Sequence, residues 1–351
     1  MERAVTCTIA PAMNGRLKEN LMELVYLCHP IKKAVGGVKV IYRQAELVDQ
    51  LLSERGHSAA VMHPNTWTFR VRWFESQVPV KRVLFKWRWV GKPSLSRIDG
   101  CFDPQRHMVV LPELWARKYG DQLARMKVPF AIFVQNGYYI SKGCAEILNE
   151  AYQGARCILT ISDDASRCVA MAFPGTESKI LRVHYSVDAS CFNPRQAKEN
   201  LITYMPRKLA DHSSKVLFFL RNHLPSHWRV VPIDGLNEVG VAELLQRSKI
   251  FMSFSHFEGC PLPPLEAALS GNQVIGYTGQ GAKEYWLPEI FDVVESGDVV
   301  RFAQKVLDKV EVLDAMDHFP IFDEAINKLS KTYSAAQERQ DMNAFIKSMG
   351  L

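Results

Sequence analysis

Two glutamates bracket a turn rich in glycine and proline within residues 255–286, which read SHFEGCPLPPLEAALSGNQVIGYTGQGAKEYW. Glu258 precedes the turn. Glu266 lies eight positions after Glu258, inside a helix predicted from about residue 263 to residue 270. A carboxylate accepts paired hydrogen bonds from neighbouring hydroxyl groups, and a helix N-terminus attracts an anion. These residue types therefore suit a ligand that carries both hydroxyl and phosphate groups.

The predicted elements around the turn would place both glutamates near one sheet edge. The apolar run KIFMSFS is typical of a buried strand, so Glu258 would fall in the loop after it. Pro263 and Pro264 suit the first turn of a helix, Gly271 suits its end, and Glu266 would lie in or near the first turn. A plain helix start with a glycine stop explains the same residues without any ligand.

A second candidate is the pair Gly36 and Gly37 in KKAVGG, between a predicted strand and a predicted helix. Glycine lets backbone N–H groups approach a phosphate closely at a helix N-terminus. The pair is not a GxGxxG fingerprint, and a plain tight turn between strand and helix accounts for it equally simply.

Strands and helices alternate along the chain in two series. In the first, the strand-like runs are ELVYLCHP, SAAVMHP, RHMVVLPE, PFAIFVQN and RCILTIS. In the second they are NLITYMP, WRVVPID, KIFMSFS, NQVIGY and FDVVES. This alternation predicts two Rossmann-like α/β domains, one over residues 1–190 and one over residues 191–325, with a helical segment over residues 326–351.

Composition sets further bounds on the chain. With 351 residues, 47% hydrophobic and 23% charged, it is long enough for two domains and is not of disordered type. Eight cysteines without a CxxC pair indicate reduced thiols and a cytoplasmic protein. We expect neither a signal peptide nor a membrane span. The net charge of +6 fits nucleic acid, a membrane surface or a phosphorylated ligand alike.

The segment FEGCPLPPLEAALSGNQVIGYTGQGAKE resembles the donor-site signature of family-4 retaining glycosyltransferases. In that signature, two glutamates separated by seven residues precede a second glycine-rich loop, here Thr278, Gly279, Gln280 and Gly281, followed by Glu284. The resemblance extends to GGVKVIYRQAELVDQLLSERGHSAAVM, which is similar to the family's N-terminal glycine loop, helix and following turn. The segment VHYSVDASCFNP resembles its interdomain element.

This resemblance implies a GT-B fold, in which two Rossmann-like domains face one another across a cleft and the last helix packs back on the N-terminal domain. The C-terminal domain would hold a nucleotide-diphosphate sugar as co-substrate, with no further cofactor. Glu258 would contact the sugar and Glu266 the ribose. The remaining donor-binding residues implied are Gly259, Cys260, Leu262, Gly36, Gly37, Asn136, Thr278 and Gly279.

The family also places an arginine and a lysine after the first strand of the donor domain to neutralise the leaving diphosphate. Arg207 stands at the matching position, and the lysine is either Lys208 or Lys215. The chain has no DxD triplet, and cations at the diphosphate would make a metal unnecessary, so we expect no metal. The resemblance further implies retention at the anomeric carbon without a protein nucleophile.

The chain also departs from the family pattern. Pro261 replaces a glycine and removes one N–H group, so Cys260 and Leu262 would supply the backbone contacts to phosphate. Gln135 and Asn136 stand where many members carry a histidine; either would bind a sugar hydroxyl or satisfy the loop backbone.

The segment VKRVLFKWRWVGK, residues 80–92, combines basic and aromatic side chains from Lys81 to Lys92. It fits contact with an anionic membrane surface, a nucleic-acid surface, or simply a solvated basic face over a core. We predict a glycosyltransferase that acts on a glycan or lipid-linked acceptor at the cytoplasmic face of a membrane, with no nucleic-acid partner. The alternatives are a nucleotide-sugar epimerase or hydrolase of GT-B shape, and a non-catalytic protein that binds nucleotide sugars or nucleic acid.

Overall fold

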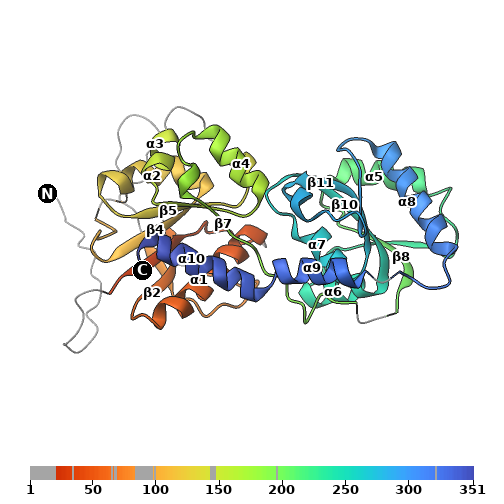
Figure 1. The fold of residues 1–351 in the computed structure, drawn as a ribbon, viewed down its shortest axis with the longest axis horizontal. Coiled ribbons are helices and arrows are strands. Elements are labelled where there is room, and N and C mark those ends of the chain that lie inside the picture. Colours follow the sequence, from red (N-terminus) through yellow and green to blue (C-terminus); the bar gives the residue numbers. More distant parts are fainter. Residues whose placement is uncertain are drawn as a thin grey trace.

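The computed structural model describes residues 21–33, 35–64, 66, 69–83, 98, 100–142, 148–194, 197–320 and 322–351. These residues form two α/β domains that lie side by side along the long axis of the molecule (Figure 1). Most of the basic and aromatic segment predicted at residues 80–92 lies outside the described residues. Among the described helices, none combines the length and the apolar character that crossing a membrane requires.

The N-terminal domain is built on a seven-stranded parallel sheet with the order β3-β2-β1-β4-β5-β6-β7. Its strands are β1 (Glu23–Leu27), β2 (Ser58–Pro64), β3 (Val80–Val83), β4 (His107–Pro112), β5 (Phe130–Val134), β6 (Cys157–Thr160) and β7 (Ile180–Arg182). Parallel neighbours need crossover connections. The connecting helices are α1 (Gly36–Ser53), α2 (Ala116–Arg125), α3 (Leu148–Gly154) and α4 (Asp163–Ala172), with short 3₁₀ turns η1 (Glu113–Trp115), η2 (Gly137–Tyr139) and η3 (Glu177–Lys179).

The first βαβ unit shows why the sequence folds this way. The apolar side chains of α1 recur at helical spacing and are buried against the sheet, among them Ile41, Ala45 and Val48. Gly56 follows the helix with a φ of 76°, a left-handed conformation that suits glycine. The predicted strand, helix and strand are all confirmed here.

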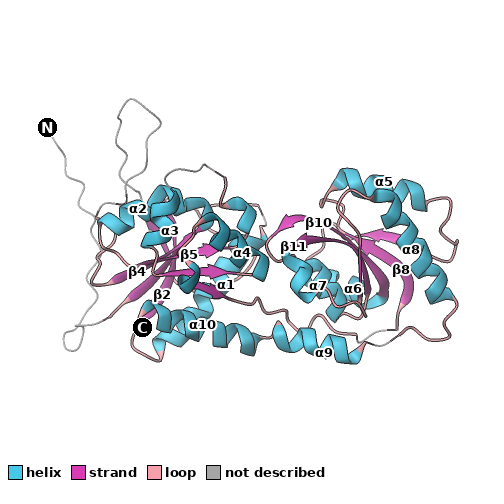
Figure 2. Ribbon diagram, turned by 45° about the horizontal axis from the view of Figure 1, so that its top comes forward, coloured by secondary structure: helices cyan, strands magenta, loops and turns pink. Residues whose placement is uncertain are grey.

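The C-terminal domain contains a five-stranded parallel sheet with the order β12-β11-β10-β8-β9. Its strands are β8 (Glu199–Tyr204), β9 (Arg229–Pro232), β10 (Ser248–Glu258), β11 (Gln273–Gln280) and β12 (Phe291–Val293). Helices cover both faces of this sheet (Figure 2). They are α5 (Ala210–Leu220), α6 (Glu238–Arg247), α7 (Leu262–Leu269) and α8 (Val299–Asp314), and the 3₁₀ turn η4 (Gly281–Tyr285) follows β11.

The last two helices belong to different domains. Helix α9 (Asp323–Thr332) packs against α7, and its Leu329 enters the core of the C-terminal domain. Helix α10 (Ala335–Met349) returns to the N-terminal domain, as Figure 1 shows, and adds Phe345 and Ile346 to the core around α1. The predicted start of the returning segment, residue 326, lies within α9.

The chain therefore crosses between the domains twice. It passes forward after β7 and back between α9 and α10, and the two crossings are joined where Val187 N donates to Tyr333 O at 2.9 Å. The predicted architecture of two facing Rossmann-like domains, with a final helix on the N-terminal domain, is confirmed.

Candidate functional site

The first glutamate of the pair lies at the end of β10, not in the loop after it. We predicted a strand that ends at Ser255, but β10 extends to Glu258. The pairing of β10 with β11 shifts register between Ser255 and Glu258, and Glu258 pairs again with Gln280. Phe257 takes a φ of 46° at this irregularity. Such irregularities redirect a side chain at a strand end, which sequence periodicity does not reveal.

Glu258 forms an ion pair with Lys208 across the strand ends. Lys208 Nζ lies 2.5 Å from Glu258 Oε1, and the side chains are 35% and 23% exposed. Lys208 belongs to the loop after β8, which ends in a left-handed residue, Leu209, with a φ of 43°. Of the two candidate lysines, Lys208 reaches the glutamate, whereas Lys215 pairs with Asp211 on α5.

Arg207 stands beside Lys208 in the same loop, and its side chain is exposed. Within the described part of the chain, it forms no ion pair. The loop after β8 thus carries one lysine held at Glu258 and one arginine open to solvent.

Helix α7 begins at the turn between the glutamates. Pro261 is its N-cap residue and Leu262 its first residue, one position earlier than predicted. As a result, the first turn holds no acidic residue and Glu266 lies in the second, which corrects the prediction of a first-turn carboxylate. Since Pro263 and Pro264 lack N–H groups, Leu262 is the donor at the start of the helix. The Pro261 carbonyl accepts a hydrogen bond from Tyr285 Oη at 2.5 Å.

Glu266 faces helix α1 of the other domain. Burial, and to a lesser extent the charge of Glu238, raise the pKa of its carboxyl to about 7, while Lys39 and Arg43 oppose the shift. Lys39 itself bridges the domains, with Nζ 2.8 Å from Glu238 Oε2. The carboxylate of Glu266 makes no hydrogen bond or ion pair with any residue that the structure describes.

Lys39 and Arg43 are site residues that the sequence did not reveal. They lie on α1, more than two hundred positions before Glu266 in the sequence, and become its neighbours only because the two domains dock. No motif marks either position.

The two domains touch directly at Gly259. A Cβ atom built there would lie 2.1 Å from Gln135 O and 3.0 Å from Asn136 Cα, so only glycine fits. Gln135 Nε2 in turn donates to Gly37 O at 3.2 Å, and a Cβ on Gly37 would lie 2.7 Å from Gln135 Oε1. Gly36 has open space around its Cβ position. Of the predicted glycine pair, only Gly37 is thus constrained by close contact.

Both polar atoms of the Asn136 side-chain amide form hydrogen bonds within this junction. Its Nδ2 donates to Phe257 O at 2.7 Å, and its Oδ1 accepts from Tyr138 N at 2.9 Å. The side chain therefore fixes its own loop and links it to the bulged end of β10. The sequence left two roles open for Asn136, binding a sugar hydroxyl or satisfying backbone groups of the loop. This arrangement corresponds to the second role.

The second glycine-rich loop packs on the first. A Cβ on Gly281 would lie 1.7 Å from Gly259 O, so the two backbones are in contact. Gly279 has a φ of 62° and lies close to the Ser255 side chain. Thr278 Oγ1 accepts a hydrogen bond from Gln280 N at 3.3 Å. The residues predicted at this loop thus gather at the carboxyl ends of β10 and β11.

Cys260 and Leu262 complete the turn between the glutamates. Both side chains pack toward the apolar cores of the two domains, and burial raises the pKa of the Cys260 thiol to about 12. Cys260 is therefore a neutral thiol that packs, while its backbone remains part of the turn. Among the described residues, no group of three or more histidine, cysteine, aspartate or glutamate side chains is placed to hold a metal ion.

Comparison with known proteins gives a fold but a limited sequence match. No protein-family model matches the chain. A segment of 84 residues is 34% identical to an alpha-1,6-glucosyltransferase of Actinobacillus pleuropneumoniae serotype 7, and the match covers 23% of this chain and 26% of that protein. The match therefore spans about a quarter of that relative's length.

Several solved structures are similar over nearly the whole chain. Anabaena HepE in complex with UDP has a TM-score of 0.66 at 12% identity and covers 93% of this chain and 100% of its own. A glycosyltransferase from Rickettsia africae has a TM-score of 0.61 at 13% identity, with 94% and 99% covered. The catalytic domain of Arabidopsis thaliana starch synthase IV, bound to ADP and acarbose, has a TM-score of 0.56 at 9% identity, with 94% and 99% covered. The fold is thus GT-B, as predicted.

Proposed function

We propose that the protein is a glycosyltransferase that moves a sugar from a nucleotide-sugar donor to an acceptor. The observation that carries the proposal is the pair of Lys208 and Glu258, a cation and a carboxylate 2.5 Å apart at the strand ends of the C-terminal domain, beside the start of α7. Similar folds are found in the UDP complex of HepE and the ADP complex of starch synthase IV. The short match to a glucosyltransferase agrees with this class.

Lys208 suits a diphosphate leaving group. Its ammonium has three N–H donors, so it can keep its bond to Glu258 while it donates to a phosphate oxygen. Arg207 from the same loop would add a second positive charge, and the start of α7 would add its positive dipole. These groups would stabilise the charge that develops as the bond between sugar and phosphate breaks.

The two glutamates would hold the neutral parts of the donor. Glu258 would accept hydrogen bonds from hydroxyls of the transferred sugar, and Glu266 would accept them from the ribose. Support for Glu266 comes from its carboxyl, which lacks a partner among the described residues and faces the N-terminal domain. The backbone of Gly259, Cys260 and Leu262 would contact the diphosphate between them.

We further propose retention at the anomeric carbon, without a metal ion. The acceptor hydroxyl would attack on the face from which the phosphate leaves, and the enzyme would act by positioning both substrates. The acceptor would be a glycan or glycolipid bound against the N-terminal domain, with contact to a membrane surface.

The test is binding and turnover with defined nucleotides. UDP, ADP, GDP and dTDP are each added to the protein and thermal unfolding is followed. One of them at about a hundred times its Kd is expected to stabilise the fold by about 2.7 kcal/mol. The matching nucleotide sugar, with a panel of glycan and glycolipid acceptors, is then expected to release nucleotide only when an acceptor is present.

Glu258→Ala is expected to lower this release about a hundredfold or more, because it removes contacts to the reacting sugar. The matched control is Glu243→Ala, which removes an exposed carboxylate on α6. Binding of oligonucleotides but of no nucleotide would refute the transferase. Conversion of the nucleotide sugar without an acceptor would identify the epimerase or hydrolase, and full activity in Glu258→Ala would remove that residue from the mechanism.

A further inference from the structure

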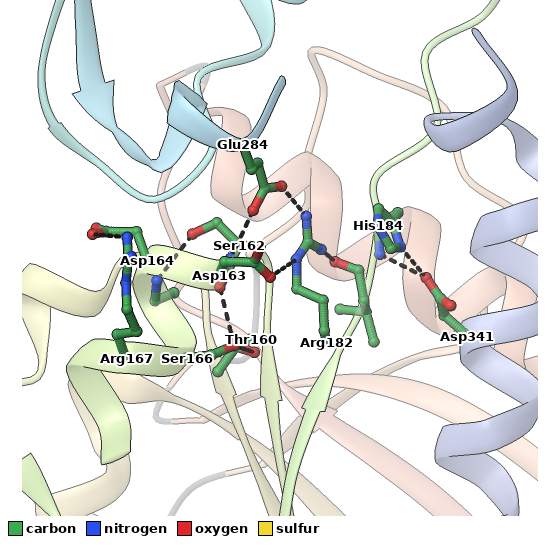
Figure 3. Close-up of polar contacts among 12 residues, drawn as sticks. Thr160, Ser162, Asp163, Asp164, Ser166, Arg167, Arg182, His184, Glu284 and Asp341 are labelled. Atoms are coloured by element: carbon green, nitrogen blue, oxygen red, sulfur yellow. Dashed lines mark hydrogen bonds and ion pairs between the residues drawn. The ribbon is translucent and has the colours of Figure 1, made fainter. Parts of the chain in front are cut away.

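Glu284 reaches from the donor domain into the N-terminal domain. It lies on η4, directly after the second glycine-rich loop, and Figure 3 shows its carboxylate between Asp163 and Arg182. Asp163 N donates to Glu284 Oε2 at 2.7 Å, Arg182 Nη2 is ion-paired with Oε1, and Tyr333 Oη donates to Oε1 at 2.9 Å. The side chains of Glu284 and Arg182 are only 14% and 18% exposed. Both carboxylate oxygens therefore have partners outside η4.

The start of α4, where the carboxylate of Glu284 lies, suits an anion for both electrostatic and hydrogen-bonding reasons. Asp163 is the first residue of α4, whose N-cap Ser162 accepts from Ala165 N at 3.0 Å and leaves the Asp163 N–H available. A carboxylate at that point interacts favourably with the helix dipole. The nearby guanidinium of Arg182 adds a charge-assisted bond. Glu284 therefore gives the start of α4 an acceptor from the opposite domain.

The same short element also holds the turn between the two glutamates. Tyr285, the next residue on η4, donates its hydroxyl to the Pro261 carbonyl at 2.5 Å. Gly281, at the start of η4, packs its backbone on Gly259. One five-residue turn thus contacts the N-terminal domain through Glu284 and the donor turn through Tyr285 and Gly281.

A cavity of about 190 Å³ lies beside this contact. Asp163, Arg182 and Glu284 line it together with Lys328 and Tyr333. Because side chains at a cavity wall have room to change rotamer, the Glu284 contact can be broken without displacing the packed cores around it.

We propose that Glu284 is a positioning residue for the donor site: its contact with Arg182 and the start of α4 sets the turn Glu258–Leu262 against Gln135 of the N-terminal domain. This proposal rests on the assigned donor site and gives a role to a residue outside it. Closure of the two domains and donor binding are then coupled, because both depend on where η4 lies.

The test compares Glu284→Gln with wild type by hydrogen exchange. The substitution keeps the size of the side chain and removes its charge. The amide of Asp163 is expected to exchange about ten- to a hundredfold faster, the factor that corresponds to one hydrogen bond to a charged group. The amides of Gly259, Cys260 and Leu262 are expected to exchange faster as well, although among the described contacts no hydrogen bond or ion pair joins Glu284 to them.

The matched control is Arg167→Ala, which removes an ion pair with Asp164 on the same helix but within one domain. It is expected to leave the amides of the donor turn unchanged. If Glu284→Gln leaves those amides as protected as in wild type, the positioning role is wrong, even if the amide of Asp163 exchanges faster.

Calorimetry with UDP provides the second readout. Glu284→Gln is expected to weaken UDP binding at least about fivefold, as coupling between separate sites does, whereas Arg167→Ala binds UDP as wild type does. Equal affinity in Glu284→Gln and wild type would overturn the proposal. If the wild-type protein binds no UDP, the calorimetry uses whichever of ADP, GDP and dTDP stabilises the fold; if it binds none of them, that result counts against the proposed donor, and the exchange of the turn amides still decides the role of Glu284.

Discussion

The two domains meet at two places that are built from different chemistry. At the donor turn, Gly259 packs on the backbone of Gln135, and the amide of Asn136 donates to Phe257 O. Around η4 and the crossings, the contacts are charged: Glu284 pairs with Arg182 across the domains, and nearby, within the N-terminal domain, His184 Nδ1 lies 2.8 Å from Asp341 Oδ2 on α10. The first junction is mainly close backbone contact, with the partly exposed ion pair of Lys39 and Glu238 beside it, whereas the second is centred on the ion pair of Glu284 and Arg182.

The pKa values of the carboxyl groups at the two junctions are shifted in opposite directions. Burial raises the pKa of Glu266 to about 7, since its cationic neighbours only partly offset that effect. Burial also acts to raise the pKa of Asp341, but hydrogen bonds from His184 and Gln337 lower it below its ordinary value. A carboxylate without a partner remains available to a ligand, whereas a paired one holds the structure together. The comparison thus distinguishes a junction with an unpaired carboxyl group from one at which the carboxyl groups are paired.

The largest effect is expected from Gly259→Ala, which breaks the backbone contact at the donor turn. The new methyl group would lie 2.1 Å from Gln135 O, so the domains must separate there. Overpacking of this kind costs about 1–3 kcal/mol, so UDP affinity is expected to fall about ten- to a hundredfold. Calorimetry measures the loss. Gly154→Ala on α3 is the control because its Cβ would meet only ordinary van der Waals contacts, and equal affinity in Gly259→Ala and wild type would disprove the close contact.

A smaller effect is expected from pH, through Glu266. Its carboxyl is half ionised near pH 7, and the ionised form is the better acceptor for ribose hydroxyls. UDP affinity is therefore expected to rise as pH increases from 6 to 8, by at most about tenfold per unit for a single proton. In the absence of ligand the sign is opposite: the folded-state pKa exceeds the unfolded value, so this group lowers stability as pH rises from about 4.5 to 7. Glu266→Gln should remove the part of the pH dependence of UDP affinity that comes from this carboxyl and leave only the part that comes from the UDP phosphate, and a profile identical to that of wild type would refute the assignment.

The smallest effect is expected from Lys39→Met. Its ion pair with Glu238 is partly exposed, so unfolding free energy is expected to fall by less than about 1 kcal/mol. The substitution should nevertheless move the midpoint of the pH profile of UDP affinity upward, because Lys39 opposes the raised pKa of Glu266. Lys215→Met, which breaks an ion pair within α5, provides the control. A midpoint that does not move would show that Lys39 has no influence on Glu266.

Local patterns in the sequence were sufficient to predict two α/β domains, whereas their GT-B arrangement was predicted from the family resemblance. Short apolar runs, the helical spacing in α1, and the prolines and glycine around α7 each act over a few residues, and the corresponding elements are present. The bulge before Glu258 was not predictable, because register depends on pairing with β11. Nor were the contacts of Gly259 with Gln135 or of Glu284 with Arg182, which depend on how two separate cores dock. The site roles of Glu258, Glu266 and Arg207 remain predictions.

The return of α10 to the N-terminal domain has a consequence for biosynthesis. Met342, Phe345, Ile346 and Met349 complete the hydrophobic core around α1, which is formed otherwise by the first half of the chain. A nascent chain emerges from its N-terminus, and domains generally fold as units in that order. Here the core on the α1 face of the N-terminal sheet is not complete until residue 349 has been synthesised, whereas the buried core on its other face uses only residues up to Phe173. The C-terminal domain can therefore complete its own core before the α1 face of the preceding sheet receives its last helix.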